Sequence, residues 1–200
     1  MLAGAWRPSG SVDGAARVDG AVDAMASVAL VSILCPDQIG LVSAVADQLF
    51  SAGVNLRDTT FAAMGSGAEF SSVCELPDGL SAERLRHELA GLPELAAAEI
   101  RVMPYPYNPA PGPLDRITHR IEVSGGDQLG LIARLSEIFT QYHANIVRLD
   151  AQKLSDAEGG RYVTRFAVAI PTAEAGNCLA AVTNTAGSLG LTSRIDDMAV

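Results

Sequence analysis

Two short runs of apolar, mostly β-branched residues stand out along the chain, and a helical pattern follows each of them. Val28–Leu34 and Ile117–Val123 are bounded by Pro or Gly, which predicts a strand in each case. After each run, apolar side chains recur with the spacing of one helix face, which predicts an amphipathic helix. These positions are Leu41, Val42, Val45 and Leu49 in the first case, and Leu131, Ile132, Leu135, Ile138, Phe139 and Tyr142 in the second.

The same succession of elements continues in each half of the chain. Asn55 and Asn145 open second strands, and turn-like breaks at 64–67 and 156–160 lead to third strands. The third strand, second helix and fourth strand are expected at 69–76, 81–91 and 98–103, and again at 162–170, 175–189 and 192–198. The order βαββαβ, read twice, predicts an α+β fold. It consists of two ferredoxin-like domains, each a four-stranded antiparallel sheet with two helices on one face.

A short motif marks the same point in both halves. Cys-Pro-Asp-Gln-Ile-Gly-Leu-Val at 35–42 returns as Gly-Gly-Asp-Gln-Leu-Gly-Leu-Ile at 125–132. A fixed period across several marker residues indicates two copies of one small domain. Three pairs keep a spacing of 90 positions: Asp37 and Asp127, Gly40 and Gly130, Asn55 and Asn145. Duplication in so short a chain favours paired binding surfaces over a catalytic centre.

Composition along the chain suggests where the domains begin and end. Residues 1–26 are rich in Ala, Gly and Asp without periodicity, so we expect a mobile tail. Prolines recur through 104–114, a pattern that suits neither a helix nor a central strand, so we expect an extended linker there. The two domains are then expected to span 27–103 and 115–200.

The net negative charge of the chain limits the kinds of partner that it is expected to bind. A net charge of −9 disfavours direct binding to nucleic acid or to an anionic membrane, because both attract clustered Lys and Arg. We see no apolar run long enough to cross a membrane and no signal peptide. Cys35, Cys74 and Cys178 lack the spacing of a metal or redox motif, so reduced thiols in a cytoplasmic protein are expected.

The two first strands differ on the face that should point away from the helices. In the second half this face carries Thr118, Arg120 and Glu122 and is polar. In the first half it is mostly apolar, which predicts that the other unit, the tail or another chain covers it. The matching positions there are Val28, Leu30, Ser32 and Leu34.

The repeated loop lies where a strand leads into a helix. We expect Asp37 and Asp127 to accept backbone N–H groups of the first helical turn. Gly40 and Gly130 are expected inside that turn, where Gly costs roughly 1 kcal/mol relative to Ala and would serve a close approach by a backbone or a ligand. A helix N-terminus attracts anions, so it suits the carboxylate of an amino acid whose ammonium meets Asp37 or Asn55. The alternative is a purely structural role, in which each Asp caps a helix, each Gly allows close packing and each Asn forms a turn.

Strand, Asp-x-x-Gly-Leu, helix and an Asn at the next strand together resemble the ACT domain, a small regulatory module that binds amino acids. The resemblance covers both halves. The first loop is similar to that of the amino-terminal ACT unit of formyltetrahydrofolate deformylases, and the tandem arrangement resembles the glycine cleavage system transcriptional repressors. Many ACT domains have Arg-Pro between the Asp and the Gly, where this chain has Gln38-Ile39 and Gln128-Leu129. Because Gly125-Gly126 replaces Cys-Pro, the second loop is expected to be more pliable.

The resemblance implies a ligand site at each loop, for a small amino acid with glycine or serine first. The implied partner is a protein such as a transcription factor or a metabolic enzyme, and the implied assembly is a homodimer. The residues expected to bind the ligand are Asp37, Gln38, Gly40, Leu41 and Asn55, and Asp127, Gln128, Gly130, Leu131 and Asn145.

Catalytic residues, metals and cofactors are not expected. His87, His119 and His143 fall in different predicted elements without metal-ligand spacing, and no catalytic or nucleotide-binding motif appears. Two alternatives to a sensor remain open. One is a ligand-free ACT-type dimerisation or interaction module. The other is a regulatory subunit or remnant of a deformylase or a phosphoserine phosphatase.

Overall fold

The structure is a computed structural model that describes residues 27–110, 112, 116–154 and 160–198. The described residues form two compact units, which divide between Pro109 and Ala110. The expected tail at 1–26 and most of the turn expected at 156–160 lie outside the described residues.

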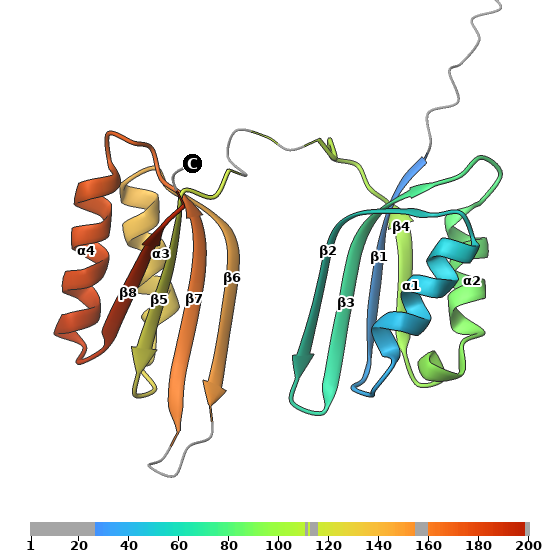
Figure 1. The fold of residues 1–200 in the computed structure, drawn as a ribbon, viewed down its shortest axis with the longest axis horizontal. Coiled ribbons are helices and arrows are strands. Elements are labelled where there is room, and N and C mark those ends of the chain that lie inside the picture. The colour runs from blue at the N-terminus through green and yellow to red at the C-terminus, as the bar shows by residue number, and fades with distance from the viewer. Residues whose placement is uncertain (1–26, 111, 113–115, 155–159, 199–200) are drawn as a thin grey trace, which may run out of the picture. The chain divides into compact units, whose positions relative to one another are not determined.

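The elements follow the predicted order closely (Figure 1). The first unit contains β1 (Ser27–Pro36), α1 (Leu41–Ser51), β2 (Asn55–Met64), β3 (Gly67–Leu76), α2 (Ala82–Ala90), the 3₁₀ turn η1 (Pro93–Leu95) and β4 (Glu99–Pro104). The second contains β5 (His119–Gly125), α3 (Leu131–Gln141), β6 (Asn145–Leu154), β7 (Arg161–Ala169), α4 (Ala175–Ser188) and β8 (Thr192–Asp197).

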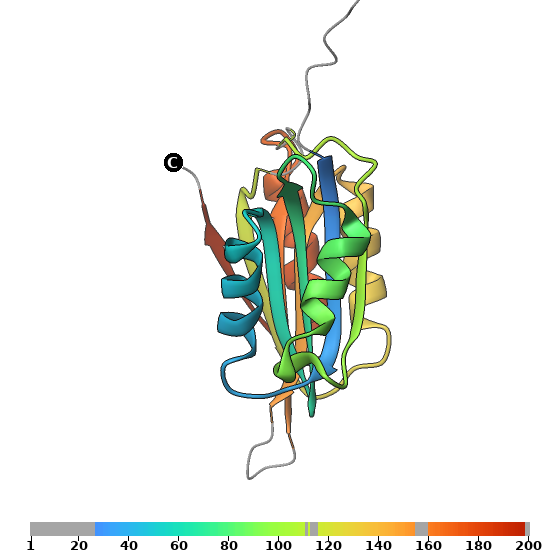
Figure 2. The same cartoon turned by 90° about the vertical axis from the view of Figure 1, so that its right-hand side faces the viewer.

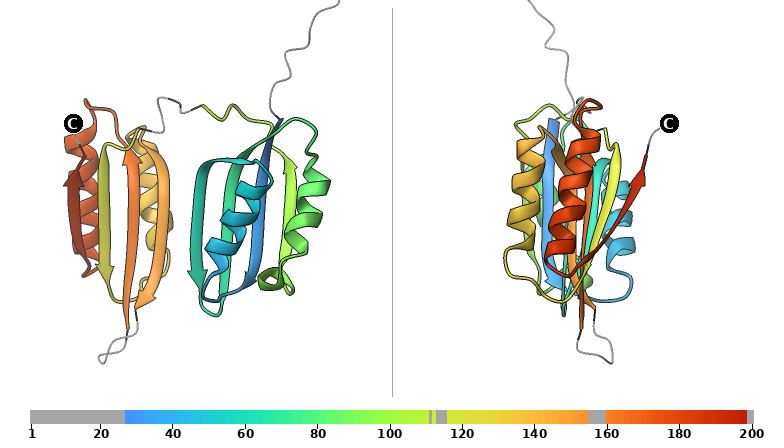
Figure 3. Two further views of the ribbon diagram at one scale, coloured as in Figure 1. Left: turned by 45° about the vertical axis from the view of Figure 1, so that its right-hand side comes forward. Right: turned by 90° about the vertical axis from the view of Figure 1, so that its left-hand side faces the viewer.

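Each unit is a four-stranded antiparallel sheet with its first strand in the centre. The strand orders are β2-β3-β1-β4 and β6-β7-β5-β8. Both helices of a unit lie over one face of its sheet. Figure 2 shows this for α1 and α2, and the right-hand view of Figure 3 shows it for α3 and α4. The predicted α+β fold of two ferredoxin-like units is therefore confirmed.

The apolar stripes of the helices and the alternation of the central strands make two separate cores. In the first unit Leu41, Val45 and Leu49 of α1 are buried against Val31 and Ile33 of β1. Burial of such a side chain stabilises the fold by about 1.5–3 kcal/mol. In the second unit the stripe on α3 is Leu131, Leu135 and Phe139. The Phe139 ring meets the Phe166 ring edge-on, with 5.2 Å between their centroids.

The sheet faces opposite the helices carry the expected contrast between the two units. Successive residues of a strand point to opposite faces, so Leu30 and Leu34 alternate with buried Val31 and Ile33. In β5, Arg120 is exposed between buried His119 and Ile121.

Among the helices of the described residues, none is long and apolar enough to cross a membrane.

The three cysteines are free and buried, which makes their reactivity a probe of the native packing. Burial, and to a smaller extent the charge of Glu174, raises the pKa of Cys178 to about 11 from 9.0. Burial likewise raises the pKa of Cys74 and of Cys35. A raised pKa leaves less thiolate near neutral pH, and the thiolate is the reactive form.

We therefore predict that a disulfide reagent labels Cys178 of the native protein at least about 100-fold more slowly than in concentrated urea near neutral pH, since two pKa units correspond to a hundredfold less thiolate. Absorbance of the released thiol dye measures the rate. Labelling of the native chain at the unfolded rate would contradict the packing described for α4.

Candidate functional site

The repeated loop forms the same tight turn before the first helix of each unit. Gly40 has φ 89° and ψ −7°, and Gly130 has φ 78° and ψ 10°. The N–H of Leu41 donates to the Gln38 carbonyl at 3.4 Å, and the N–H of Leu131 donates to the Gln128 carbonyl at 3.3 Å. These angles match the third position of a type II turn, a position that favours Gly because φ is positive.

Two expectations for this loop are wrong. Neither α1 nor α3 has a side-chain hydrogen bond at its N-cap, so Asp37 and Asp127 do not cap the helices. Gly40 and Gly130 occupy the N-cap position rather than the first turn. The physical reason is the turn itself, which places the glycine between the aspartate and the helix. A Cβ built on either glycine meets no heavy atom within 4 Å, so backbone conformation, not close packing, accounts for the glycine.

The same turn leaves a large apolar side chain in solvent in each unit. Ile39 is 104% exposed and Leu129 is 101% exposed, as in an isolated extended residue. Both lie just before the turn glycine, 90 positions apart. The sequence interpretation missed them as site residues, although the signal was there: an apolar residue repeated inside a polar turn motif.

A hollow of about 600 Å³ adjoins the loop in the first unit. It brings together four of the predicted residues and adds Phe61 of β2, which is 42% exposed. Its lining is Asp37, Gln38, Ile39, Gly40, Leu41, Val42, Ser43 and Phe61. The side chain of Leu41 is 2% exposed and belongs mainly to the core. The hollow is therefore bounded by a charged loop on one side and apolar side chains on the other.

Two hydrogen bonds hold the first loop in place. The N–H of Asp37 donates to the carbonyl of Ser66, in the turn between β2 and β3, at 2.9 Å. The Gln38 side-chain amide donates to the carbonyl of Glu94, in η1, at 2.6 Å. The loop is thus anchored to two other parts of its own unit, so its exposed residues project from a fixed base.

Asn55 does not join this hollow. It begins β2 and donates through Nδ2 to the Glu75 carboxylate at 2.7 Å. Glu75 lies eight residues along β3 from Gly67, which pairs with the last residue of β1. Eight strand residues span roughly 26 Å. Within the first unit, Asn55 therefore lies too far from Asp37 to contact the same small ligand. Asn145 has the corresponding place at the start of β6.

Comparison with known proteins rests on structures, because no protein-family model and no curated protein matches the chain. An unknown protein from Galdieria sulphuraria is 18% identical with a TM-score of 0.67, and the match covers 86% of this chain and 99% of that chain. A candidate glycine cleavage system transcriptional repressor is 15% identical with a TM-score of 0.60, covering 87% and 98%. The chain has the fold of a tandem ACT-domain protein. An ACT domain protein from Streptococcus pneumoniae also matches, at 18% identity and a TM-score of 0.36, over 40% of this chain and 90% of that chain.

The two ACT-type loops differ for a packing reason at their first residue. A Cβ on Gly125 would lie 2.5 Å from Leu191 Cδ2 and 3.4 Å from Leu191 Cα, so the buried Leu191 side chain would have to shift to make room for it. Close packing against Leu191 therefore favours a glycine at this position. In the first unit the position holds Cys35, a residue that is 5% exposed and whose pKa is raised by burial and by Asp37. A less acidic thiol is a poorer nucleophile near neutral pH.

The cap assignments predict a contrast within the first unit. Ser81 caps α2, accepting from the N–H of Arg84 at 3.1 Å, whereas Asp37 caps nothing. Ser81→Ala should lower the free energy of unfolding by about 0.5–2 kcal/mol, and Asp37→Ala should change it by less than about 0.5 kcal/mol. Urea titration of both variants measures the difference. Equal losses would restore Asp37 as a cap.

The turn glycines predict a second contrast, in the second unit. Gly130→Ala should destabilise by about 1–2 kcal/mol, because an L-residue is strained at positive φ. Gly176→Ala in α4 is the matched control, with no atom within 4 Å of the new Cβ, and should stabilise by up to about 1 kcal/mol. Thermal melts read by circular dichroism follow both. Stabilisation by Gly130→Ala would overturn the turn assignment.

Proposed function

We propose that the chain is a non-catalytic regulatory protein that binds a small amino acid, glycine or serine first, at its repeated loops and signals to a protein partner. One observation carries the proposal: the same turn leaves Ile39 and Leu129 fully in solvent in both units. Folding gains nothing from such exposure, and its recurrence 90 positions apart indicates a surface kept for contact. The likeness in fold to a candidate glycine cleavage system transcriptional repressor supports the metabolic setting.

The chemistry of the first loop suits an amino acid. Without a side-chain cap, N–H groups in the first turn of α1 remain available to a carboxylate at the positive end of the helix. Asp37 is exposed on the same hollow and accepts an ammonium. Glycine has about five non-hydrogen atoms, which limits its affinity to the low micromolar range at about −1.5 kcal/mol per atom. Gln38 lines the same hollow, and its side-chain amide also holds the loop to the Glu94 carbonyl.

Signalling needs a second surface, and the first unit offers one. On the face of its sheet away from the helices, Leu34 is 51% exposed, Met64 51% and Met103 42%. A homodimer or a partner protein that covers these residues would gain from their burial. Ligand at the loop then shifts the assembly to the extent that it binds one packing arrangement better than another.

A ligand-free interaction module is the second candidate. It is favoured by Phe50, which is 82% exposed on α1, a helix that also carries half-exposed Val42. Apolar side chains on the outer side of a helix suit direct contact with another protein. In that case the loop and α1 form one docking surface, and no amino acid takes part.

Thermal-shift titration with each of the twenty amino acids separates the two candidates. Glycine or serine at about 100 times its dissociation constant should stabilise the protein by about 2.7 kcal/mol and raise Tm by a few degrees. Asp37→Asn should abolish the part of the shift that comes from the first loop, because it removes the charge that meets the ammonium. Phe50→Ser is the matched control on α1 and should leave the shift unchanged.

Silence of all twenty amino acids up to tens of millimolar would contradict sensing. A shift lost in Phe50→Ser but kept in Asp37→Asn would move the site from the loop to the helix. In the ligand-free case, Phe50→Ser should instead weaken capture of the partner protein.

A further inference from the structure

The open face of the second unit carries charged side chains in ordered rows. The strand register places Arg148 of β6, Ala167 of β7 and Arg120 of β5 side by side, followed by Asp196 of β8. The next row is Asp150, Arg165, Glu122 and Arg194. Both rows lie on the face opposite α3 and α4.

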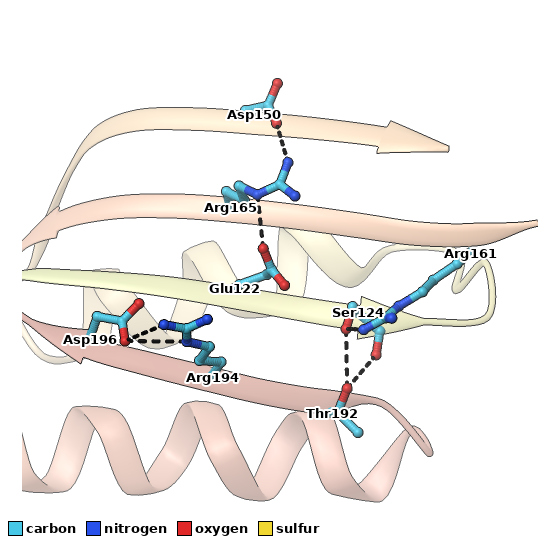
Figure 4. Close-up of polar contacts among 8 residues, drawn as sticks. All are labelled: Glu122, Ser124, Asp150, Arg161, Arg165, Thr192, Arg194 and Asp196. Carbon is cyan, nitrogen blue, oxygen red and sulfur yellow. Dashed lines mark hydrogen bonds and ion pairs between the residues drawn. The ribbon is translucent and has the colours of Figure 1, made fainter. Parts of the chain in front are cut away.

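The charges of the second row are paired within the sheet. Arg165 lies between two carboxylates, as Figure 4 shows: its Nε donates to Glu122 at 2.9 Å and its Nη1 to Asp150 at 3.3 Å. Arg194 donates to Asp196 at 3.2 and 3.3 Å. These contacts account for three carboxylates and two guanidinium groups on this face.

Arg120 and Arg148 differ from their neighbours. Within the part of the chain that the structure describes, neither guanidinium has a hydrogen bond or an ion pair. Both are exposed, and Ala167 between them is too small to fill the space above the sheet. A hollow of about 680 Å³ lies here, lined by Arg120, Arg148, Ala167, Glu122, Asp150 and Asp196 among others.

The fold does not require a charge at Arg120 or Asp196. The first unit has the same sheet, and the positions that match Arg120, Ala167 and Asp196 in its register are Leu30, Val73 and Met103, which are all apolar. Near the position of Arg148 the first unit also has charged residues, Arg57 and Asp58. The charges at Arg120 and Asp196 therefore set the second unit apart, in a chain whose net charge is −9.

The charges of the hollow define what fits it. Arg165 with its two carboxylates leaves one negative charge, and Arg194 cancels Asp196. Arg120 and Arg148 add two positive charges, which no described residue pairs. We propose that this hollow binds an acidic amino acid. Its two carboxylates lie on Arg120 and Arg148, and its ammonium lies against the carboxylates that flank Arg165.

The spacing of the two arginines supports a ligand with two anionic ends. Their backbones are two strand spacings apart, about 10 Å. Arginine side chains are long enough for both guanidinium groups to meet a short carbon chain above Ala167. Each guanidinium can donate two hydrogen bonds to a carboxylate in a charge-assisted, bidentate geometry. Nucleic acid fits less well, because the three carboxylates on the same face repel a polyanion.

Three probes of nearly the same size test the ligand chemistry by calorimetric titration in low-salt buffer. L-Glutamate should bind saturably and at least about tenfold more tightly than glutarate, which lacks the ammonium, or L-glutamine, which lacks one carboxylate. Salt should weaken the binding, because both arginines are exposed. Absence of saturable binding, or L-glutamine as tight as L-glutamate, would overturn the site.

Variants locate the binding on the sheet face. Arg120→Gln and Arg148→Gln should each weaken L-glutamate binding at least about tenfold. Arg161→Gln is the matched control, with the same charge change on the same sheet face but outside the hollow, and should change affinity less than about threefold. Its guanidinium donates to Ser124, which does not line the hollow. Equal losses in all three variants would reveal only general charge attraction and refute the site. Circular dichroism checks each fold, and Arg148→Gln decides if Arg120→Gln misfolds.

The proposed site at the loops and the proposed site on the sheet face can be tested separately. Glycine titration of Arg120→Gln reports on the loops, and L-glutamate titration of Asp37→Asn reports on the sheet face, so either proposal can fail alone. Light scattering tests the inference in one more way. It would be contradicted by a stable dimer that has Arg120 in its interface and that L-glutamate does not dissociate.

Discussion

Within each unit, the two helices cover one face of the sheet, and most of what the described residues present to other molecules follows from that. The helices supply apolar stripes such as Leu41, Val45 and Leu49, which seal the inner face against β1 and β3. Every second residue of the central strands is thereby committed to the core. The remaining residues have no folding task beyond solubility, so they were free to become Leu30 in one unit and Arg120 in the other. The two units share one scaffold but differ in the residues on their outer sheet faces.

The loops obey a different constraint, set by the backbone alone. A strand that ends at the bottom of the sheet must reverse before the helix can run back over it, and a type II turn does this in four residues. Gly40 and Gly130 are required by the angle of that turn. The residue before each glycine then points outward, which is how Ile39 and Leu129 come to lie in solvent. A requirement of chain reversal thus creates a fixed, exposed apolar residue at the head of a helix.

The elements could be predicted because their signals are local. Apolar, mostly β-branched runs predicted β1 and β5, helical spacing predicted α1 and α3, and the period of 90 residues aligned the two halves. The loop geometry could not be predicted in the same way. An Asp before a helix is usually a cap, and only φ of 89° shows that the glycine intervenes. The sequence could not predict the row of Arg148, Ala167 and Arg120 either, because the row joins three strands and depends on the register in which they pair.

The second strand of each unit has one more consequence. β2 and β6 are ten residues long and lie at the edges of their sheets, so that in the described part of the chain each pairs with one neighbouring strand. Such an edge is a template on which a foreign strand can add, and long flat edges promote aggregation. Both strands carry an irregularity near their start, between Leu56 and Thr59 and between Ile146 and Arg148. A bulge of this kind bends the strand and breaks the straight run of free backbone groups. Each unit has such a bulge, which keeps its edge strand from aggregating and so keeps the protein soluble.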